Sequence, residues 1–409
     1  MVEHFFRHES GRLVATLTRA FGIENLTLAE DVVQDALVKA LTTWPYQGVP
    51  RNPAAWITQV ARRIALDVVR RKKRFQEKQD KIIATLESSA LDEGPISPDD
   101  EIGDDRLRLM FACCHPVIPM EAQVALTLKT LCGFGVSEIS SAFLCSDAAI
   151  SKRLTRARQG IRQAGVGFCI PEGEELSERL DAVLSSLYLL FNEGYKASQG
   201  NRLVKRDLCD EAIRLTGLLV GFPGADVPKV HALRALMCLN ASRLGARTDG
   251  MGQLLRLRDQ DRSKWDARLI SLGMKHFAMS GQGGELTEYH LQAAIAAAHC
   301  RASDYVSTNW ELILSLYDHL AELSSSPLVV LNRAVALAEV RGPEVALKSL
   351  ENLDGRKELE GYHLLDAVKA EMWARMGCRE EAASSFQRAI DLCGVDSERT
   401  FLIRQKASL

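Results

Sequence analysis

Residues 135–165 read GVSEISSAFLCSDAAISKRLTRARQGIRQAG and contain two predicted helices separated by a short turn. The spacing of the apolar residues predicts a short helix over 137–144, with Ile139 and Phe143 inward, and a longer helix over 148–162. The apolar residues of the longer helix recur at helical spacing, and we expect this stripe to be buried: Ile150, Leu154, Ala157 and Ile161.

The opposite side of the longer helix is basic, and no acidic residue occurs between Ser151 and Arg162. An apolar back and a basic outer face suit a helix that enters the DNA major groove. The stretch therefore predicts a helix-turn-helix. The alternative is a plain helical hairpin with a solvated basic face.

The composition of the whole chain also favours helices. The chain has 409 residues, of which 46% are hydrophobic and only 6% aromatic, and its formal net charge is -2. This is ordinary usage for a globular protein and argues against a disordered, collagen-like or disulfide-scaffold protein. The length suggests two to four domains at roughly 100 to 200 residues each. We predict an all-α protein.

The sequence shows no membrane or export signal. No stretch approaches the roughly 20 apolar residues that a membrane helix needs, and the N-terminal residues MVEHFFRHESGR lack the apolar core of a signal peptide. We therefore expect a cytoplasmic protein without a membrane partner, in which the ten cysteines are free thiols.

The charge is unevenly distributed along the chain. Residues 1–78 carry a net charge of +5, residues 79–105 of -8, residues 106–169 of +5 and residues 170–409 of -4. Clustered basic charge indicates a phosphate-bearing partner such as nucleic acid. The acidic stretch is rich in Pro, Gly and Ser, so we predict a flexible linker there, between two basic modules.

Two helices are predicted in the first basic module. Residues 29–41, AEDVVQDALVKAL, place apolar residues on one side and acidic residues on the other. Residues 44–53 contain three prolines and a glycine and are predicted as a loop. A basic helix follows over 53–74, PAAWITQVARRIALDVVRRKKR, with a predicted apolar stripe: Ile57, Val60, Ala61, Ile64 and Val68.

The order of these pieces resembles the extracytoplasmic-function sigma factors of bacterial RNA polymerase, over roughly residues 1–165. The resemblance implies that the helix 29–43 binds core polymerase through Glu30, Asp31, Gln34 and Asp35. It implies that the next loop and helix bind the promoter -10 element through Trp44, Trp56, Gln59, Arg62, Arg63, Asp67 and Arg70. It implies that the helix 148–162 binds the -35 element through Lys152, Arg153, Thr155, Arg156 and Arg158. Many members have Asn where this chain has Arg63, so no particular -10 sequence is carried over.

The remaining 240 residues exceed a small sigma factor and resemble a subgroup with a long C-terminal helical extension, in the runs LYLLFNEGYKAS, DLCDEAIRL, DQDRSKWD and YHLLDAVKAE. An internal repeat supports this, because four residue pairs lie 36 apart: Ala334 and Ala370, Ala338 and Ala374, Ala346 and Ala382, Leu350 and Phe386. This spacing is typical of tetratricopeptide-like helix pairs. We predict a helical extension over 170–285 and tetratricopeptide-like repeats over 286–409, which could hold an unidentified protein or ligand.

Two clusters allow an enzymatic interpretation. Cys113, Cys114 and His115, with Cys132 and Cys145 nearby, could ligate zinc, although adjacent cysteines on a helix point about 100° apart and fit one tetrahedral site poorly. The alternative is a helix end closed by His115 and Pro116. The polar cluster 259–266 could do acid–base work, but a network of helix caps and salt bridges is the more common role of such residues. We therefore predict no catalytic residue, no metal and no cofactor.

The sequence thus predicts a sigma factor that is not an enzyme, with RNA polymerase core and promoter DNA as partners. The alternative is a helix-turn-helix regulator with a helical sensor domain, which would bind duplex DNA without core polymerase. The acidic side of the helix 29–43 favours the first interpretation.

Overall fold

The structure is a computed structural model that describes residues 2–71, 82–84, 86, 105–143, 145–196, 204–222, 224–250, 253–353, 359 and 361–409, with backbone alone for 2–8 and 352. Across these residues the regular elements are helices, apart from an isolated β-bridge between Thr248 and Leu254, which confirms the all-α prediction. The chain divides into two compact units, unit 1 (residues 1–186) and unit 2 (residues 187–409). In the described ranges, no helix combines the length and the apolar character needed to cross a membrane.

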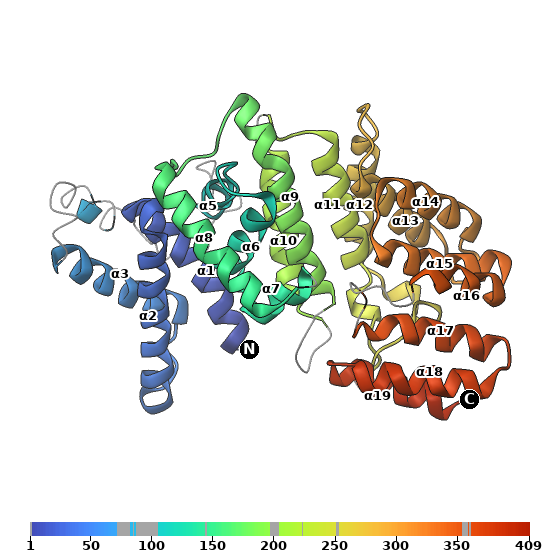
Figure 1. The fold of residues 1–409 in the computed structure, drawn as a ribbon. Helices are drawn as coiled ribbons and strands as arrows, with labels where there is room; N and C mark the ends of the chain where they lie inside the picture. The colour runs from blue at the N-terminus through green and yellow to red at the C-terminus, as the bar shows by residue number, and fades with distance from the viewer. Residues whose placement is uncertain are drawn as a thin grey trace. The chain divides into compact units, whose positions relative to one another are not determined.

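Unit 1 is built from the N-terminal helices and the first half of α9 (Figure 1). Its elements are α1 (Val2–Phe21), η1 (Ile23–Asn25), α2 (Leu26–Gln47), α3 (Pro53–Arg71), α5 (Asp105–Cys113), α6 (Met120–Thr130), α7 (Val136–Ala142), α8 (Asp147–Ala164) and α9 (Gly173–Tyr195). Most of the predicted linker, and Lys72, Lys73 and Arg74 of the predicted basic helix, lie outside the described residues.

Helix α2 is longer than the sequence predicts, because it includes Trp44–Gln47, which we assigned to a loop. Pro45 lies inside its last turns, where the missing N–H removes one helical hydrogen bond. The helix ends at Gly48, which has a φ of 81° and donates its N–H to the carbonyl of Trp44 over 2.9 Å. Glycine adopts a positive φ at low cost, so the helix can end at Gly48, three residues after the proline.

Helix α3 buries only part of the predicted stripe. Its buried residues are Ile57, Thr58, Ala61, Ala65 and Val69, whereas Val60, Ile64 and Val68 are only partly buried. The stripe runs along the two alanines because small side chains let α3 approach α1 and α2 closely. The buried side follows a spacing of four from Ile57 to Val69, so the prediction is one residue off in the second half of the helix.

The helix-turn-helix pattern predicted for 135–165 corresponds to α7 and α8. The predicted stripe of α8 is buried, with Ile150, Leu154, Ala157 and Ile161 each at most 3% exposed. Ser146 caps the helix by accepting a hydrogen bond from the N–H of Ala149 over 3.3 Å, and Gly165 ends it with a φ of 62°. Phe143, predicted inward, is partly buried.

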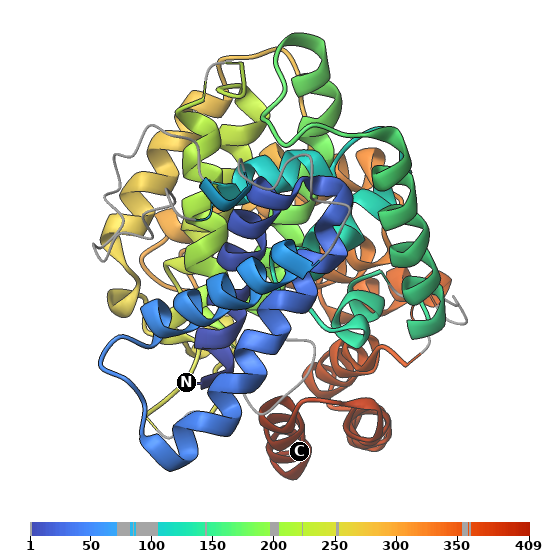
Figure 2. The ribbon, with the colours of Figure 1, turned by 90° about the vertical axis from the view of Figure 1, so that its left-hand side faces the viewer.

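The two basic modules of the sequence pack together in unit 1. Helix α1 contacts α5, and η1 contacts α8 (Figures 1 and 2). At Gly11 of α1 the backbones come so close that a Cβ atom would lie 2.0 Å from the carbonyl oxygen of Leu131. A side chain at position 11 is therefore incompatible with this packing.

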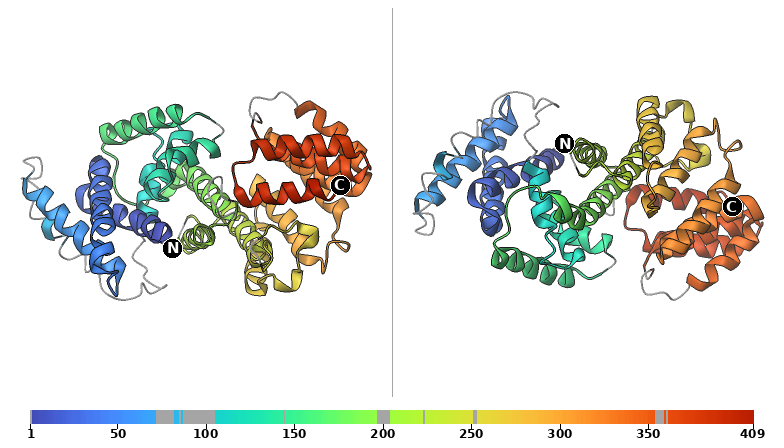
Figure 3. Two further views of the ribbon diagram at one scale, coloured as in Figure 1. Left: turned by 90° about the horizontal axis from the view of Figure 1, so that it is seen from below. Right: turned by 90° about the horizontal axis from the view of Figure 1, so that it is seen from above.

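Unit 2 is a succession of helices. After the second half of α9 come α10 (Arg206–Val220), α11 (Pro228–Ala241), η3 (Leu244–Ala246), η4 (Leu257–Asp259), η5 (Arg262–Lys264), α12 (Ala267–Ser280), α13 (Glu288–Arg301), α14 (Trp310–Leu323), α15 (Pro327–Arg341), α16 (Pro343–Leu350), η6 (Glu351–Leu353), α17 (His363–Arg375), α18 (Arg379–Leu392) and α19 (Asp396–Ala407). Each α-helix from α10 to α19 packs against its neighbours in sequence, and α17, α18 and α19 lie side by side (Figure 3).

The 36-residue repeat of the sequence falls on two consecutive helix pairs. Ala334 of α15 and its repeat equivalent Ala370 of α17 are both fully buried. Ala346 of α16 and its repeat equivalent Ala382 of α18 are fully buried as well. Small buried residues therefore recur at equivalent positions of the two helix pairs.

Candidate nucleic-acid interface

The predicted -10 residues of α3 share its solvent-facing side. Gln59, Arg63, Asp67 and Arg70 are exposed and follow one another at spacings of three and four, opposite the buried stripe. Arg62 is partly buried beside this face. Arg63 and Arg70 outweigh Asp67 on this face, and Arg62 beside it adds to the net positive charge, as a surface that binds phosphates requires.

The two predicted tryptophans meet where α2 and α3 are joined. The rings of Trp44 and Trp56 pack edge to face, with centroids 5.6 Å apart and an interplanar angle of 64°. Tyr46, two residues after Trp44, is 90% exposed. An exposed aromatic ring beside a basic helix is a platform on which an unpaired base can stack. We did not single out Tyr46 from the sequence, although it lies in the stretch 44–53 that the resemblance assigns to the -10 element.

Three of the four predicted polymerase-binding residues are exposed on α2: Asp31, Gln34 and Asp35. The same side of the helix continues into two large apolar residues, Val38 at 56% and Leu41 at 54% exposure. Spacings of three and four place all five on one face. This acidic and apolar face of α2 has the mixed character of a protein-binding surface.

The predicted -35 residues of α8 fall into two groups. Lys152, Thr155 and Arg156 are exposed. Arg153 is instead held by the protein, with an ion pair of 2.9 Å to Glu121 and its guanidinium 5.3 Å from the ring centre of Phe143. The exposed group alone forms a face that DNA could reach without rearrangement.

Arg158 and Glu30, predicted to bind different partners, bind each other. The guanidinium of Arg158 donates two hydrogen bonds to the carboxylate of Glu30, at 3.1 and 3.2 Å. The hydroxyl of Thr130 donates a third, over 3.2 Å. The side chains of Glu30 and Arg158 are 15% and 25% exposed. The predicted polymerase helix and the predicted -35 helix are thus joined by a bidentate, partly buried ion pair.

The Cys113–His115 motif lies at a helix end. Helix α5 ends at Cys113, close to the helix end predicted at His115 and Pro116, and both cysteines are fully buried. Burial raises the pKa of Cys114 to about 12, and its sulfur lies 3.6 Å from the hydroxyl oxygen of Thr127. A thiol with so high a pKa disfavours the thiolate that metal binding needs.

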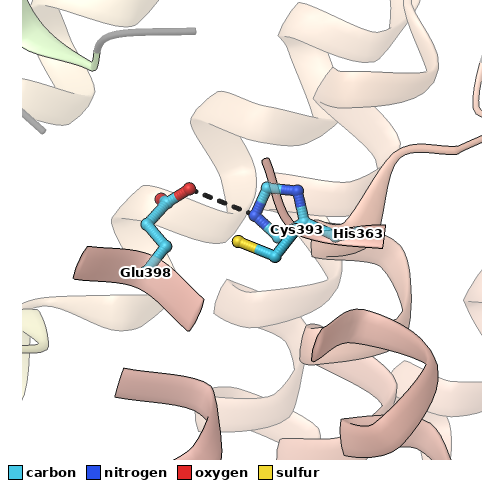
Figure 4. Close-up of side chains that lie close together, drawn as sticks. All are labelled: His363, Cys393 and Glu398. Carbon is cyan, nitrogen blue, oxygen red and sulfur yellow. Dashed lines mark ion pairs between the residues drawn. The ribbon is translucent and has the colours of Figure 1, made fainter. Parts of the chain in front are cut away.

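A separate group of potential metal ligands lies in unit 2, where the ligand atoms of His363, Cys393 and Glu398 are within 4.8 Å of one another (Figure 4). One carboxylate oxygen of Glu398 lies 3.2 Å from Nε2 of His363, and the other lies 3.2 Å from Nζ of Lys196. Burial acts to raise the pKa of Glu398, but His363 and Lys196 outweigh it and the pKa is lowered. Both carboxylate oxygens therefore have basic partners already, and the group ties α17 to α19.

The polar cluster 259–266 forms helix caps and buried hydrogen bonds, as the commoner interpretation predicted. Asp261 and Asp266 accept backbone N–H groups at the starts of η5 and α12. Arg262 donates to the carbonyls of His299 and Ala302 over 2.7 and 2.9 Å. These bonds fix the segment between α11 and α12 against α13.

The segment that begins η4 reaches the last helices of unit 2. Arg256 lies 3.4 Å from Glu371 of α17 and donates to Gln405 of α19 over 3.1 Å. Arg258 lies 3.2 Å from Glu371 and 3.9 Å from Glu339 of α15. These residues border a cavity of about 290 Å³ whose lining includes Phe386 and Phe401. The cavity is one place in unit 2 where a partner or ligand could be held.

Comparison with known proteins identifies a family for the N-terminal part of the chain. Residues 6–75 match the Sigma-70 region 2 family model, and residues 179–281 match a family of unknown function (DUF6596). The uncharacterized protein R00370 of Rhizobium meliloti (strain 1021) is 39% identical over 399 residues, which cover 96% of this chain and 94% of that protein. No solved structure matches the chain. The region 2 match includes α2 and α3 and supports a sigma-factor-like role for this part of the chain.

Proposed function

Because the chain belongs to the same family as the Rhizobium protein R00370 and begins with a sigma-70 region 2 domain, we propose that it is a sigma factor of the extracytoplasmic-function type. In this proposal it directs core RNA polymerase to specific promoters and assists strand opening. Catalysis belongs to the polymerase, and this chain supplies binding and base recognition.

The observation that carries the proposal is the arrangement of α2 and α3 within the matched region. The exposed acidic and apolar face of α2 would bind core polymerase, and the exposed face of α3 would lie on the -10 element. Trp44, Trp56 and Tyr46 would receive an unpaired base, which compensates for the few kcal/mol that unstacking costs. Lys152, Thr155 and Arg156 of α8 would contact the -35 element.

Run-off transcription with purified core polymerase on a library of upstream regions tests the proposal. We expect the full-length chain to produce transcripts from a small set of templates that share two spaced elements. A chain that binds duplex DNA specifically, yet neither associates with core polymerase nor starts transcripts, would be a helix-turn-helix regulator instead.

We further propose that the helix pairs of unit 2 are tetratricopeptide-like repeats and that unit 2 regulates this activity. The cavity beside Arg256 and Arg258 supports the proposal, because it offers an apolar lining and charged groups to a partner. A chain cut after Tyr195 keeps α9 whole, including Arg179, which donates to the carbonyl of Phe111 over 3.4 Å within unit 1. We expect this shortened chain to lose promoter-specific transcription. Equal output from the short and full-length chains would contradict a regulatory role.

A further inference from the structure

We propose that the Glu30–Arg158 ion pair is a latch that keeps unit 1 closed in the free protein and must open before the chain can bind polymerase and a promoter together. The inference rests on the proposed sigma function. It goes beyond that function because it assigns a regulatory state to residues that were expected to contact polymerase and DNA.

The first argument is one of length. The -10 and -35 elements lie about 25 base pairs apart, which is roughly 85 Å on straight B-DNA. A compact unit the length of unit 1 has a radius of gyration near 16 Å and hence a diameter of about 40 Å. The exposed faces of α3 and α8 therefore cannot reach both elements while they belong to one closed unit.

The covalent chain permits separation. The stretch between Arg71 and Asp105 can span at most about 110 Å, which exceeds the distance between the two elements. What opposes separation is the packing between the modules. Arg19 of α1 lies 3.3 Å from Asp105 of α5, Gly11 of α1 lies against the carbonyl of Leu131, and Glu30 is bound by Thr130 and Arg158.

The second argument is that the latch uses residues from both predicted binding surfaces. Glu30 was predicted together with Asp31 to bind polymerase, and Arg158 was predicted together with Arg156 to bind the -35 element. In the closed unit the carboxylate and the guanidinium satisfy each other. Polymerase or DNA can contact them only if the pair breaks, so binding and opening are coupled.

The conformational experiment uses the full-length chain without polymerase. Dyes placed at the exposed positions Lys39 of α2 and Gln163 of α8, through unnatural amino acids, report the separation of the modules by energy transfer. We expect Glu30→Arg and Arg158→Glu each to lower the transfer efficiency, and the double swap to restore it because the pair is re-formed. Arg162→Glu, which makes the same charge change on α8 away from Glu30, is the matched control and should leave the transfer at the wild-type value.

The binding experiment uses variants outside the predicted binding surfaces. Thr130→Val removes one hydrogen bond to Glu30, and Gly11→Ala places a methyl group against the carbonyl of Leu131. If the closed form dominates, each should tighten association with core polymerase by up to about tenfold, because more of the chain is competent to bind. Circular dichroism and thermal melting establish that both variants remain folded.

The outcomes separate the latch from the proposed function. Unchanged energy transfer in both charge-reversed variants, or a double swap that stays open, would overturn the latch. If Thr130→Val and Gly11→Ala lower the energy transfer but do not tighten association with core polymerase, the latch has no regulatory role. If neither wild type nor variants bind core polymerase while the charge swap behaves as expected, the latch stands as a conformational device and the sigma proposal fails.

Discussion

Arg156 and Arg158 lie two positions apart on α8, yet only Arg156 faces solvent, whereas Arg158 is bound to Glu30 across the module boundary. Positions two apart on a helix point in widely different directions, so a run of basic residues divides into those that can meet DNA and those that pack inward. The basic character of a sequence segment therefore overstates the surface available to phosphates.

Arg156→Ala should weaken binding of the protein to a mapped promoter. If Arg156 contacts a phosphate, the slope of log affinity against log salt concentration should fall by about one. Arg153→Ala is the matched comparison, because Arg153 is engaged by Glu121 and Phe143; it should lower the melting temperature and leave the salt slope nearly unchanged. Fluorescence anisotropy at several salt concentrations measures both. A wild-type slope for Arg156→Ala would place this face of α8 away from DNA.

Reversing both charges at Asp31 and Asp35 should weaken association with core polymerase by about tenfold or more, because a docking surface then meets a like charge. Both side chains are exposed, so the fold should be kept. Glu174 and Glu178 of α9 are a matched pair, exposed, acidic and one turn apart in the same unit, and reversing them should have little effect. Co-elution with core polymerase is the measurement, and equal loss from both double variants would indicate a general charge effect.

Tyr46→Ala should slow promoter opening while leaving binding to closed duplex DNA nearly intact. The expected loss corresponds to the stacking of one base, about 1–3 kcal/mol. Fluorescence of 2-aminopurine placed in the -10 element follows the opening step. Tyr46→Phe keeps the ring and should behave as wild type. If Tyr46→Ala opens promoters at the normal rate, this exposed ring has no part in base capture.

Unit 2 should lose stability in acid through His299. Burial, with Arg243 and Arg262 nearby, lowers the pKa of His299 to about 3, against 6.5 in the unfolded chain. The unfolded state binds the proton more tightly, so stability is full above pH 6.5 and falls as the pH decreases towards 3. From pH 7 to pH 5 the loss from this group is about 2 kcal/mol. Thermal melts should show this loss of stability between pH 7 and pH 5 in the wild type. The control His319→Gln, which replaces an exposed histidine, should show the same loss, and His299→Gln should show a smaller one. The same pH dependence in all three proteins would assign the loss to other groups.

Periodicity predicted the helices well where one face is apolar throughout. The stripe of α8 was found correctly because its large apolar residues are also its buried ones. The stripe of α3 was found only in part, since Ile57 and Ala61 are buried as predicted, whereas Ala65 is buried in place of the predicted Ile64. The proline rule also predicted the end of α2 too early. The helix continues past Pro45 to Gln47, and Trp44 in this last part packs on Trp56 of α3, a contact that the local sequence does not reveal.

The sequence predicted which residues belong to the candidate site, but it did not predict how these residues contact one another. The exposed groups on α2, α3 and α8 follow from helical spacing. The Glu30–Arg158 pair joins residues 128 apart in sequence, and no local pattern contains it. Contacts of this kind depend on how the two modules dock, which is decided by packing surfaces such as Gly11 against Leu131.

The contacts of Arg256 have a consequence for how unit 2 folds and unfolds. In an array whose repeats touch only their neighbours, unfolding can begin at an end and spread one repeat at a time. Arg256 reaches residues 115 and 149 positions later, and so bridges most of the unit's length. The terminal helices should therefore not fray independently. Unit 2 should lose its structure in a single cooperative step, and it should fold slowly for a helical protein because these distant partners must first meet.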